Sequence, residues 1–229
     1  AMPKSPMKET DPSYTRFFPD GPAPQDLVAR DVYAGKVLGQ FSKRAFRRPV
    51  EDRKVTQLVG MARRIYEQPN RTFEDGIGRA MMAVLGSPRF LFRIEESNPS
   101  TETERYPVLD EYALASRLSY FLWSTMPDEE LIELADRGDL RRELTKQVFR
   151  MLKDPKASQG IVRNFTGQWL QVRDVITVEI NGKAVLGKGK VNGNRKTKYD
   201  FDGKIRQVMR TETEMYFGHV MREDRSVLE

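Results

Sequence analysis

The most strongly charged part of the sequence is the basic stretch from Lys183 to Lys198. It contains six cationic side chains and no acidic one: Lys183, Lys188, Lys190, Arg195, Lys196 and Lys198. The formal net charge of the chain is +6, so this stretch accounts for the whole excess of positive charge. Such a local field attracts polyanions, for example sulfated glycans or nucleic acid. Because no aromatic side chain lies between the cations to stack on bases, nucleic acid is disfavoured, and a solvated hairpin without a ligand is the simpler interpretation.

A second basic cluster consists of Arg44, Arg47 and Arg48, near the end of an expected helix. These side chains could bind an acidic partner or a substrate carboxylate. We favour the simpler interpretation, in which they neutralise helix-terminal carbonyls and pair with nearby carboxylates such as Glu51 and Asp52.

Paired carboxylates are the groups that hydrolyse glycosidic bonds, and Glu212 and Glu214, with Asp200 and Asp202 nearby, could supply them. Two residues apart on a helix, however, Glu212 and Glu214 point in different directions, which argues against catalysis. His219 could bind a metal or haem, but a lone histidine is more often a surface or hydrogen-bonded residue.

Aromatic residues are dense in two segments of the second half of the chain. Tyr120, Phe121 and Trp123 could line a sugar or cofactor pocket, but their helical spacing is more typical of a core. The same interpretation applies to Phe165 and Trp169.

The composition excludes several kinds of site. The chain has no cysteine, which rules out disulfides, thiolate metal sites, cysteine nucleophiles and covalently attached c-type haem within it. It has one histidine, which argues against a multi-histidine metal site. No apolar run approaches the roughly 18 residues that a transmembrane helix needs.

The elements that must position these residues are expected to be mostly helical. Apolar residues recur at three- and four-residue spacing through most of the chain, which predicts a mainly α protein of about eight helices in two packed helical modules. Thr72 and Asp110 are expected helix caps, and Gly86 an expected helix end. The predicted organisation is an irregular arm (1–22), a first module (23–97), a linker (98–108) and a second module (109–229).

One segment departs from the helical pattern. The β-branched run Val175–Ile180 and the turns Asn181-Gly182 and Asn192-Gly193 predict a small β-meander over 175–201, inserted before the last helix. This meander would carry the basic stretch.

Several strings in the sequence resemble one family, the large secreted planctomycetal cytochrome c-type proteins, which join helical domains of unknown function to a haem-binding segment. The strings are Phe41–Val50, Gly86–Arg93, Ala113–Ser124, Met126–Leu131 and Asn164–Leu170. The family's Cys-x-x-Cys-His motif is absent here, so the resemblance implies a fragment or truncated member without a cofactor of its own, any haem lying on a partner or a missing segment.

The resemblance implies a secreted or periplasmic protein whose partners are other domains or proteins of a cytochrome c-type assembly. The leading hypothesis is a non-catalytic scaffold module that positions a redox or polysaccharide-processing partner. The alternative is a polyanion-binding module that uses the basic stretch, with an anionic polysaccharide such as a sulfated glycan or, less favoured, nucleic acid as its ligand. A second alternative is a polysaccharide-cleaving enzyme that uses carboxylates.

Overall fold

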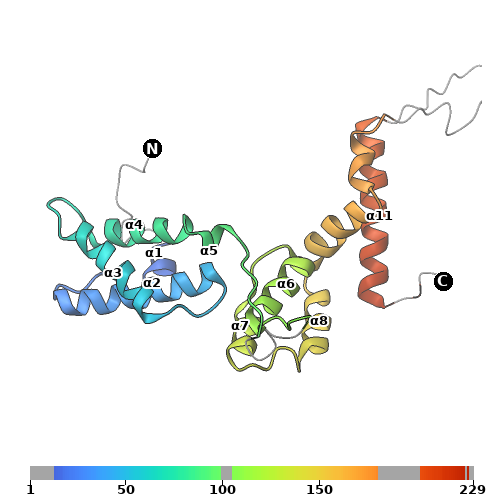
Figure 1. Cartoon of the computed structure of the whole chain (residues 1–229). Coiled ribbons are helices and arrows are strands. Elements are labelled where there is room, and N and C mark those ends of the chain that lie inside the picture. The colour runs from blue at the N-terminus through green and yellow to red at the C-terminus, as the bar shows by residue number, and fades with distance from the viewer. Residues whose placement is uncertain (1–12, 99–104, 180–201, 225, 227–229) are drawn as a thin grey trace, which may run out of the picture. The chain divides into compact units, whose positions relative to one another are not determined.

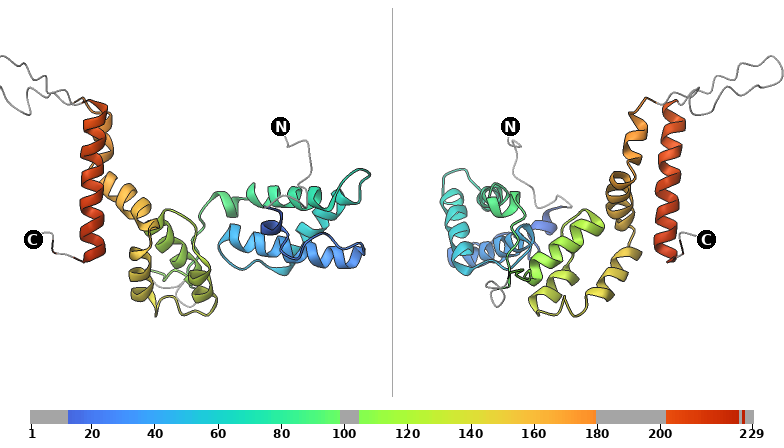
Figure 2. Two further views of the ribbon diagram at one scale, coloured as in Figure 1. Left: turned by 180° about the vertical axis from the view of Figure 1, so that it is seen from behind. Right: turned by 45° about the vertical axis from the view of Figure 1, so that its right-hand side comes forward.

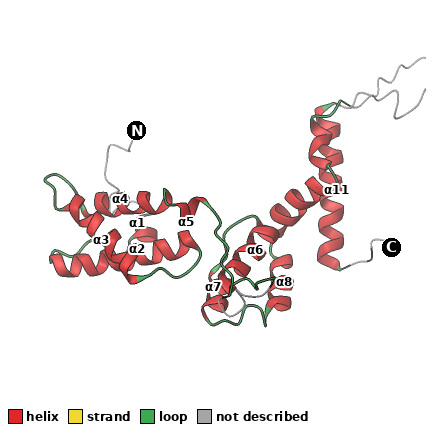
Figure 3. Cartoon of the chain, viewed as in Figure 1, coloured by secondary structure: helices red, strands yellow, loops and turns green. Residues whose placement is uncertain are grey.

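The computed structural model describes residues 13–98, 105–179, 202–224 and 226. These residues are mainly helical, which confirms the predicted main class, and they contain no β-strand, only an isolated antiparallel bridge between Ser97 and Leu109 (Figure 3). The helices are α1 (Tyr14–Phe17), α2 (Leu27–Phe46), α3 (Asp52–Tyr66), α4 (Phe73–Leu85), α5 (Pro88–Leu91), α6 (Glu111–Trp123), α7 (Glu129–Asp136), α8 (Leu144–Lys153), the π-helix η2 (Ser158–Thr166), α9 (Gly167–Trp169), the 3₁₀-helix η3 (Val172–Ile176) and α11 (Gly203–Glu223).

The β-meander predicted over 175–201 is wrong where the structure describes the chain. The sequence predicts its first strand over Val175–Ile180, but η3 takes up the start of this run and Thr177 forms a turn. Residues 180–201, which include both Asn-Gly turns and the basic stretch, lie outside the described residues.

Hydrogen bonds explain why this β-branched run does without a sheet partner here. The backbone N–H of Val178 donates to the carbonyl of Asp174 at 2.8 Å, which closes a local turn. The guanidinium of Arg206, from α11, donates to the carbonyls of Ile176 and Val178 at 3.3 and 2.6 Å. Backbone groups satisfied in this way gain nothing further from a β-ladder.

The chain divides into two compact units, Ala1–Ala113 and Leu114–Glu229, and each has its own hydrophobic core. In the first unit, α2, α3 and α4 pack together (Figure 1). The predicted linker at 98–108 stays a prediction, because residues 99–104 lie outside the described part of the chain.

The core of the first unit is built around Phe73, the first residue of α4. Its ring centroid lies 6.0, 5.7 and 5.5 Å from those of Phe18, Tyr33 and Tyr66. The hydroxyl of Thr72 accepts from the backbone N–H of Asp75, and the Asp75 carboxylate accepts from the backbone N–H of Thr72. This capping box fixes where α4 begins and therefore where the Phe73 ring enters the core.

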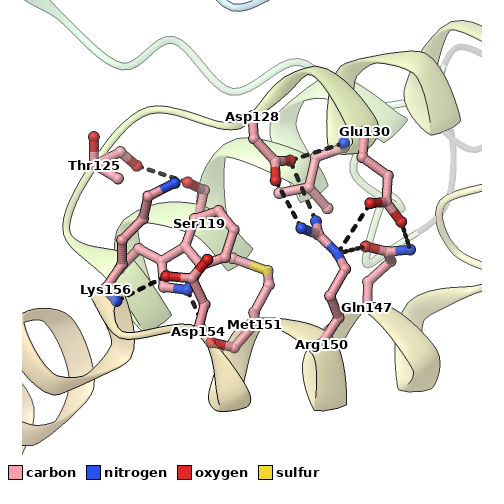
Figure 4. A network of polar contacts seen from close by, with 11 residues as sticks. Ser119, Thr125, Asp128, Glu130, Gln147, Arg150, Met151, Asp154 and Lys156 are labelled. Atoms are coloured by element: carbon pink, nitrogen blue, oxygen red, sulfur yellow. Dashed lines mark hydrogen bonds and ion pairs between the residues drawn. The ribbon is translucent and has the colours of Figure 1, made fainter.

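A network of polar contacts that includes Asp128, Gln147 and Arg150 stabilises the second unit (Figure 4), and Trp123, which is 3% exposed, packs against it. The indole N–H donates to the carbonyl of Met151 at 2.9 Å. The Arg150 guanidinium and the Lys156 ammonium lie 5.4 and 4.4 Å from the Trp123 ring, which are cation–π distances. The end of α6 is therefore fixed to α8 and to the chain that follows it.

The same network joins α7 to α8. One Asp128 carboxylate oxygen caps α7 by accepting from the backbone N–H of Leu131, and the two oxygens accept from Arg150 at 2.7 and 3.3 Å. Gln147, 2% exposed, donates to Glu130 at 2.7 Å and accepts from Arg150 at 2.6 Å. Both the amide nitrogen and the amide oxygen of the buried Gln147 side chain therefore have hydrogen-bond partners, as is usual for buried polar groups.

The π-helix η2 packs closely on the end of α6 and beside α11 (Figure 2). A Cβ placed on Gly160 would lie 2.1 Å from the Leu122 carbonyl oxygen and 2.6 Å from the Trp123 Cα, so only glycine fits there. None of the helices in the described ranges is long and apolar enough to cross a membrane.

Candidate functional site

Three aromatic side chains of the second unit lie together on its surface. Phe121, Phe165 and Trp169 are 54%, 41% and 63% exposed. The centroids of Phe121 and Phe165 are 5.6 Å apart in an edge-to-face arrangement, and those of Phe165 and Trp169 are 5.9 Å apart with ring planes inclined by 23°. We call these three residues the aromatic surface. The prediction that they belong to the core is wrong, whereas the same prediction for Trp123 is confirmed.

The helices that carry the rings present other residues to the interior. On α6, Leu122 and Trp123 are buried, and on η2 and α9, Val162, Thr166 and Gly167 are buried. The rings therefore stand on the opposite side of helices that are anchored in the core. Exposed aromatic clusters of this kind are typical of interaction sites.

A hydrogen-bonded pair of uncharged side chains belongs to the same two segments. The Asn164 amide donates to the Ser124 hydroxyl at 2.7 Å, and both residues are exposed. Ser124 has a φ of 55°, in the left-handed region that residues other than glycine rarely adopt. Ser124 directly follows α6, and a left-handed residue at this position is a common way for a helix to end.

A second exposed apolar surface lies along α11. The side of this helix that bears Ile205, Val208, Met209, Met215 and Tyr216 is exposed. We call these five residues the α11 stripe. Their spacing places them on one side of the helix, while α11 packs on η2, η3 and α8 through its other side.

The two candidate carboxylates of α11 have different roles. Glu214 accepts from the Arg210 guanidinium at 2.7 Å and forms an ion pair with Arg163 at 3.5 Å, and its side chain is 13% exposed. Glu212 is exposed, and it is separated from Val208 and Met215 by four and three residues, so it lies within the α11 stripe. No ion pair is formed by Glu212 with any residue that the structure describes.

The remaining candidates on α11 and beside it have ordinary positions. Asp202 caps the helix by accepting from the backbone N–H of Ile205 at 2.9 Å, and His219 is exposed. Asp200 lies outside the described residues. Within the ranges that the structure covers, no group of three or more His, Cys, Asp or Glu residues could hold a metal ion.

The structure does not bring Arg44, Arg47 and Arg48 together as a set of free cations. Arg44 is exposed. Arg47 is 9% exposed, and its guanidinium donates to the carbonyl of Arg89 at 3.3 Å. Arg48 pairs with Glu96 and, at 3.1 Å, with Asp110, and it lies near the ring of Tyr112. Arg47 and Arg48 therefore make contacts inside the first unit, with partners other than the predicted ones.

The basic stretch, with Lys183, Lys188, Lys190, Arg195, Lys196 and Lys198, lies outside the described residues. Its proposed role rests on the sequence alone.

Comparison with known protein families finds a match for the second half of the chain. Residues 109–229 match the family PSD4, described as Protein of unknown function (DUF1592), and this is more than half of the chain. The chain belongs to the DUF1592 family. Residues 33–95 match a second family, PSD5, described as Protein of unknown function (DUF1595). Neither the curated proteins nor the solved structures yield a match.

The sequence resemblance is confirmed as far as these two domains of unknown function. In this DUF1592 protein, the aromatic surface and the α11 stripe both lie within the matched residues 109–229. Periodicity does reveal the apolar residues of both surfaces. It does not reveal that they stay uncovered.

Proposed function

We propose that this DUF1592 protein is a non-catalytic interaction module of a secreted assembly that contains a c-type cytochrome. The single observation that carries the proposal is the α11 stripe, an exposed row of apolar side chains on a helix whose other side packs in the unit. Val208, Met215 and Tyr216 are 65%, 68% and 58% exposed, which is more than soluble surfaces usually leave uncovered in one row. A helix with a second apolar side fits the groove or helix of a partner.

Glu212 specifies what kind of partner fits. If two copies of this chain packed stripe against stripe, with the middles of the two stripes facing each other, their Glu212 carboxylates would come together. The two negative charges would repel each other, which disfavours this pairing. A partner with an apolar row interrupted by a lysine or arginine would instead neutralise Glu212. The stripe therefore favours a different protein over a second copy of this chain.

The resemblance to planctomycetal cytochrome c-type proteins supports the choice of assembly. Two adjoining domains of the chain are those that the resemblance implies. This chain has no cysteine with which to attach haem, so the redox chemistry would reside on the partner.

The test uses the full chain immobilised and exposed to the secreted proteins of the organism that makes it. We expect retention of a protein that shows the absorption bands of c-type haem. Val208→Asp, in the α11 stripe, should abolish retention, because it places a charge in an apolar contact.

The matched control is Gln207→Asp, which adds the same charge to α11 at an exposed position outside the stripe. It should retain the haem protein as the unchanged chain does. Retention of no haem protein, or equal loss with both variants, would contradict the proposal.

A further inference from the structure

The aromatic surface is separate from the α11 stripe and presents a different chemistry. Its three rings contact one another and remain about half exposed. Aromatic rings carry negative charge on their faces and positive charge at their edges. They therefore stack against flat groups whose C–H bonds point outward, such as the apolar face of a pyranose ring.

The hydrogen-bonded pair described above adds polar groups of the matching kind. Ser124 follows Phe121 by three residues, one turn along the chain, and Asn164 directly precedes Phe165. With the Asn164 amide donating to the Ser124 hydroxyl, the hydroxyl proton and the amide oxygen are still free to donate and accept. A donor and an acceptor side by side are complementary to neighbouring hydroxyl groups of a sugar.

The two segments that supply the rings carry no charge of their own, which favours a neutral ligand. Residues 118–127 and 164–172, the segments that supply the rings and the polar pair, contain no charged side chain. Of the cations that flank these segments, Arg163 is paired with Glu214, and the Arg173 side chain lies against Gly167. Sites that stack nucleic acid or hold sulfated glycans place cations among the aromatic rings, and here they are absent from both segments.

We infer that the aromatic surface is a binding site for a neutral polysaccharide. Pyranose rings stack on Trp169 and Phe121, and the Ser124–Asn164 pair hydrogen-bonds to their hydroxyl groups. This inference does not depend on the proposed function, because the two use different surfaces and different ligands.

The chain supplies its own reporter for the test. It has two tryptophans, of which Trp123 is 3% and Trp169 63% exposed. Titration of the full chain with cellohexaose, xylohexaose and laminarihexaose should shift the tryptophan emission to shorter wavelength and protect it from acrylamide quenching for at least one glycan. Calorimetry should give the same dissociation constant.

Trp169→Ala should weaken binding by about tenfold or more, the size of losing one stacked ring. Phe121→Ala should also weaken it, whereas Phe149→Ala should not. Phe149 is the matched control, because it is 56% exposed in the same unit but belongs to α8. All three residues are exposed, so circular dichroism should show unchanged helicity.

The inference is overturned if none of the three glycans binds at millimolar concentration, or if Trp169→Ala binds as tightly as the unchanged chain. Binding of heparin alone would also overturn it and would favour the basic stretch as the ligand site. Loss of haem-protein retention in Trp169→Ala, without glycan binding, would show that the rings contact a protein instead.

Discussion

Gly76 and Gly78 lie two residues apart in α4, but their surroundings differ. We therefore expect replacement by alanine to have opposite effects on stability at the two positions. A Cβ on Gly76 would lie 2.5 Å from the Ala62 carbonyl oxygen and 2.8 Å from the Tyr66 ring, whereas one on Gly78 would meet nothing within 4 Å. Gly76→Ala should therefore destabilise the chain by about 1–3 kcal/mol, because α3 and α4 must separate. Gly78→Ala should stabilise it by about 0.5–1 kcal/mol, because alanine favours the helix. Urea unfolding followed by circular dichroism checks both, and equal signs would contradict the packing described for α3 and α4.

Tyr66 makes the first unit sensitive to alkaline pH. Burial, the hydrogen bond that its hydroxyl donates to Asp31 and the charge of that carboxylate raise the pKa of Tyr66 far above its ordinary value. An unfolded tyrosine titrates near pH 10 while the folded one keeps its proton, so this contribution to stability is complete below about pH 10. It is lost as the pH rises from there through the folded pKa.

Tyr66→Phe should reduce the fall in the free energy of unfolding between about pH 9 and 11, since it removes the group whose pKa differs between the two states. Tyr106→Phe, at a residue that is 75% exposed, is the control and should leave the slope unchanged. Urea unfolding of the full chain at a series of pH values measures both slopes. An unchanged slope in Tyr66→Phe would contradict the role given to its hydroxyl.

At the scale of the elements, Asp128 both caps α7 and joins it to α8 through Arg150. Asp128→Ala should cost at least about 1 kcal/mol, because it removes the cap and leaves the Arg150 guanidinium without its carboxylate. Glu133→Ala changes an exposed carboxylate in the middle of the same helix and should stay within about 0.5 kcal/mol of the unchanged chain. Urea unfolding compares them, and a loss no larger than that of Glu133→Ala would contradict the network of Figure 4.

The ends of elements could be predicted from the sequence because caps act over three residues. The side chains of Thr72 and Asp110 accept from backbone N–H groups three residues on, as predicted, and α4 ends before Gly86. The prediction failed where distant contacts decide. The β-branched run after Asp174 has the pattern of a strand, but its Ile176 and Val178 carbonyls accept from Arg206, 30 and 28 positions away in the sequence.

The aromatic surface and the α11 stripe could be predicted only in part, because exposure also depends on contacts with distant elements. Spacing shows which residues share one side of a helix, but not which side another element covers. The apolar residues of α11 form two groups, and packing on η2 and η3 uses the one without Val208 and Met215. Phe121 and Trp169 were assigned to the core for the same reason, although their helices bury other side chains.

At the scale of the whole molecule, the distribution of charge makes a separate prediction about polyanions. If the basic stretch binds sulfated polysaccharide, heparin should bind the full chain with an affinity that falls steeply as salt rises. Replacing Lys188, Lys190, Lys196 and Lys198 by glutamate should abolish this binding.

The control for that experiment reverses Lys54, Lys146, Lys153 and Lys204, which changes the net charge equally but spreads the change over exposed lysines elsewhere. It should retain salt-sensitive binding. If both variants lose heparin to the same extent, net charge rather than the basic stretch is responsible.

The wide winding of η2 makes this part of the protein sensitive to the number of its residues as well as to their identity. A π-helix bonds each residue to the fifth one along and so holds more chain per turn than an α-helix. Deleting one exposed residue from it, such as Gln159, would let the segment close into an α-helix, whose narrower winding would rotate Phe165 relative to Gly160, which is held against Leu122. Phe165 and Trp169 would then rotate away from Phe121 with no aromatic residue altered. Among members of the DUF1592 family, a one-residue gap between α8 and α9 would therefore mark the loss of the aromatic surface even where all three aromatic residues are kept.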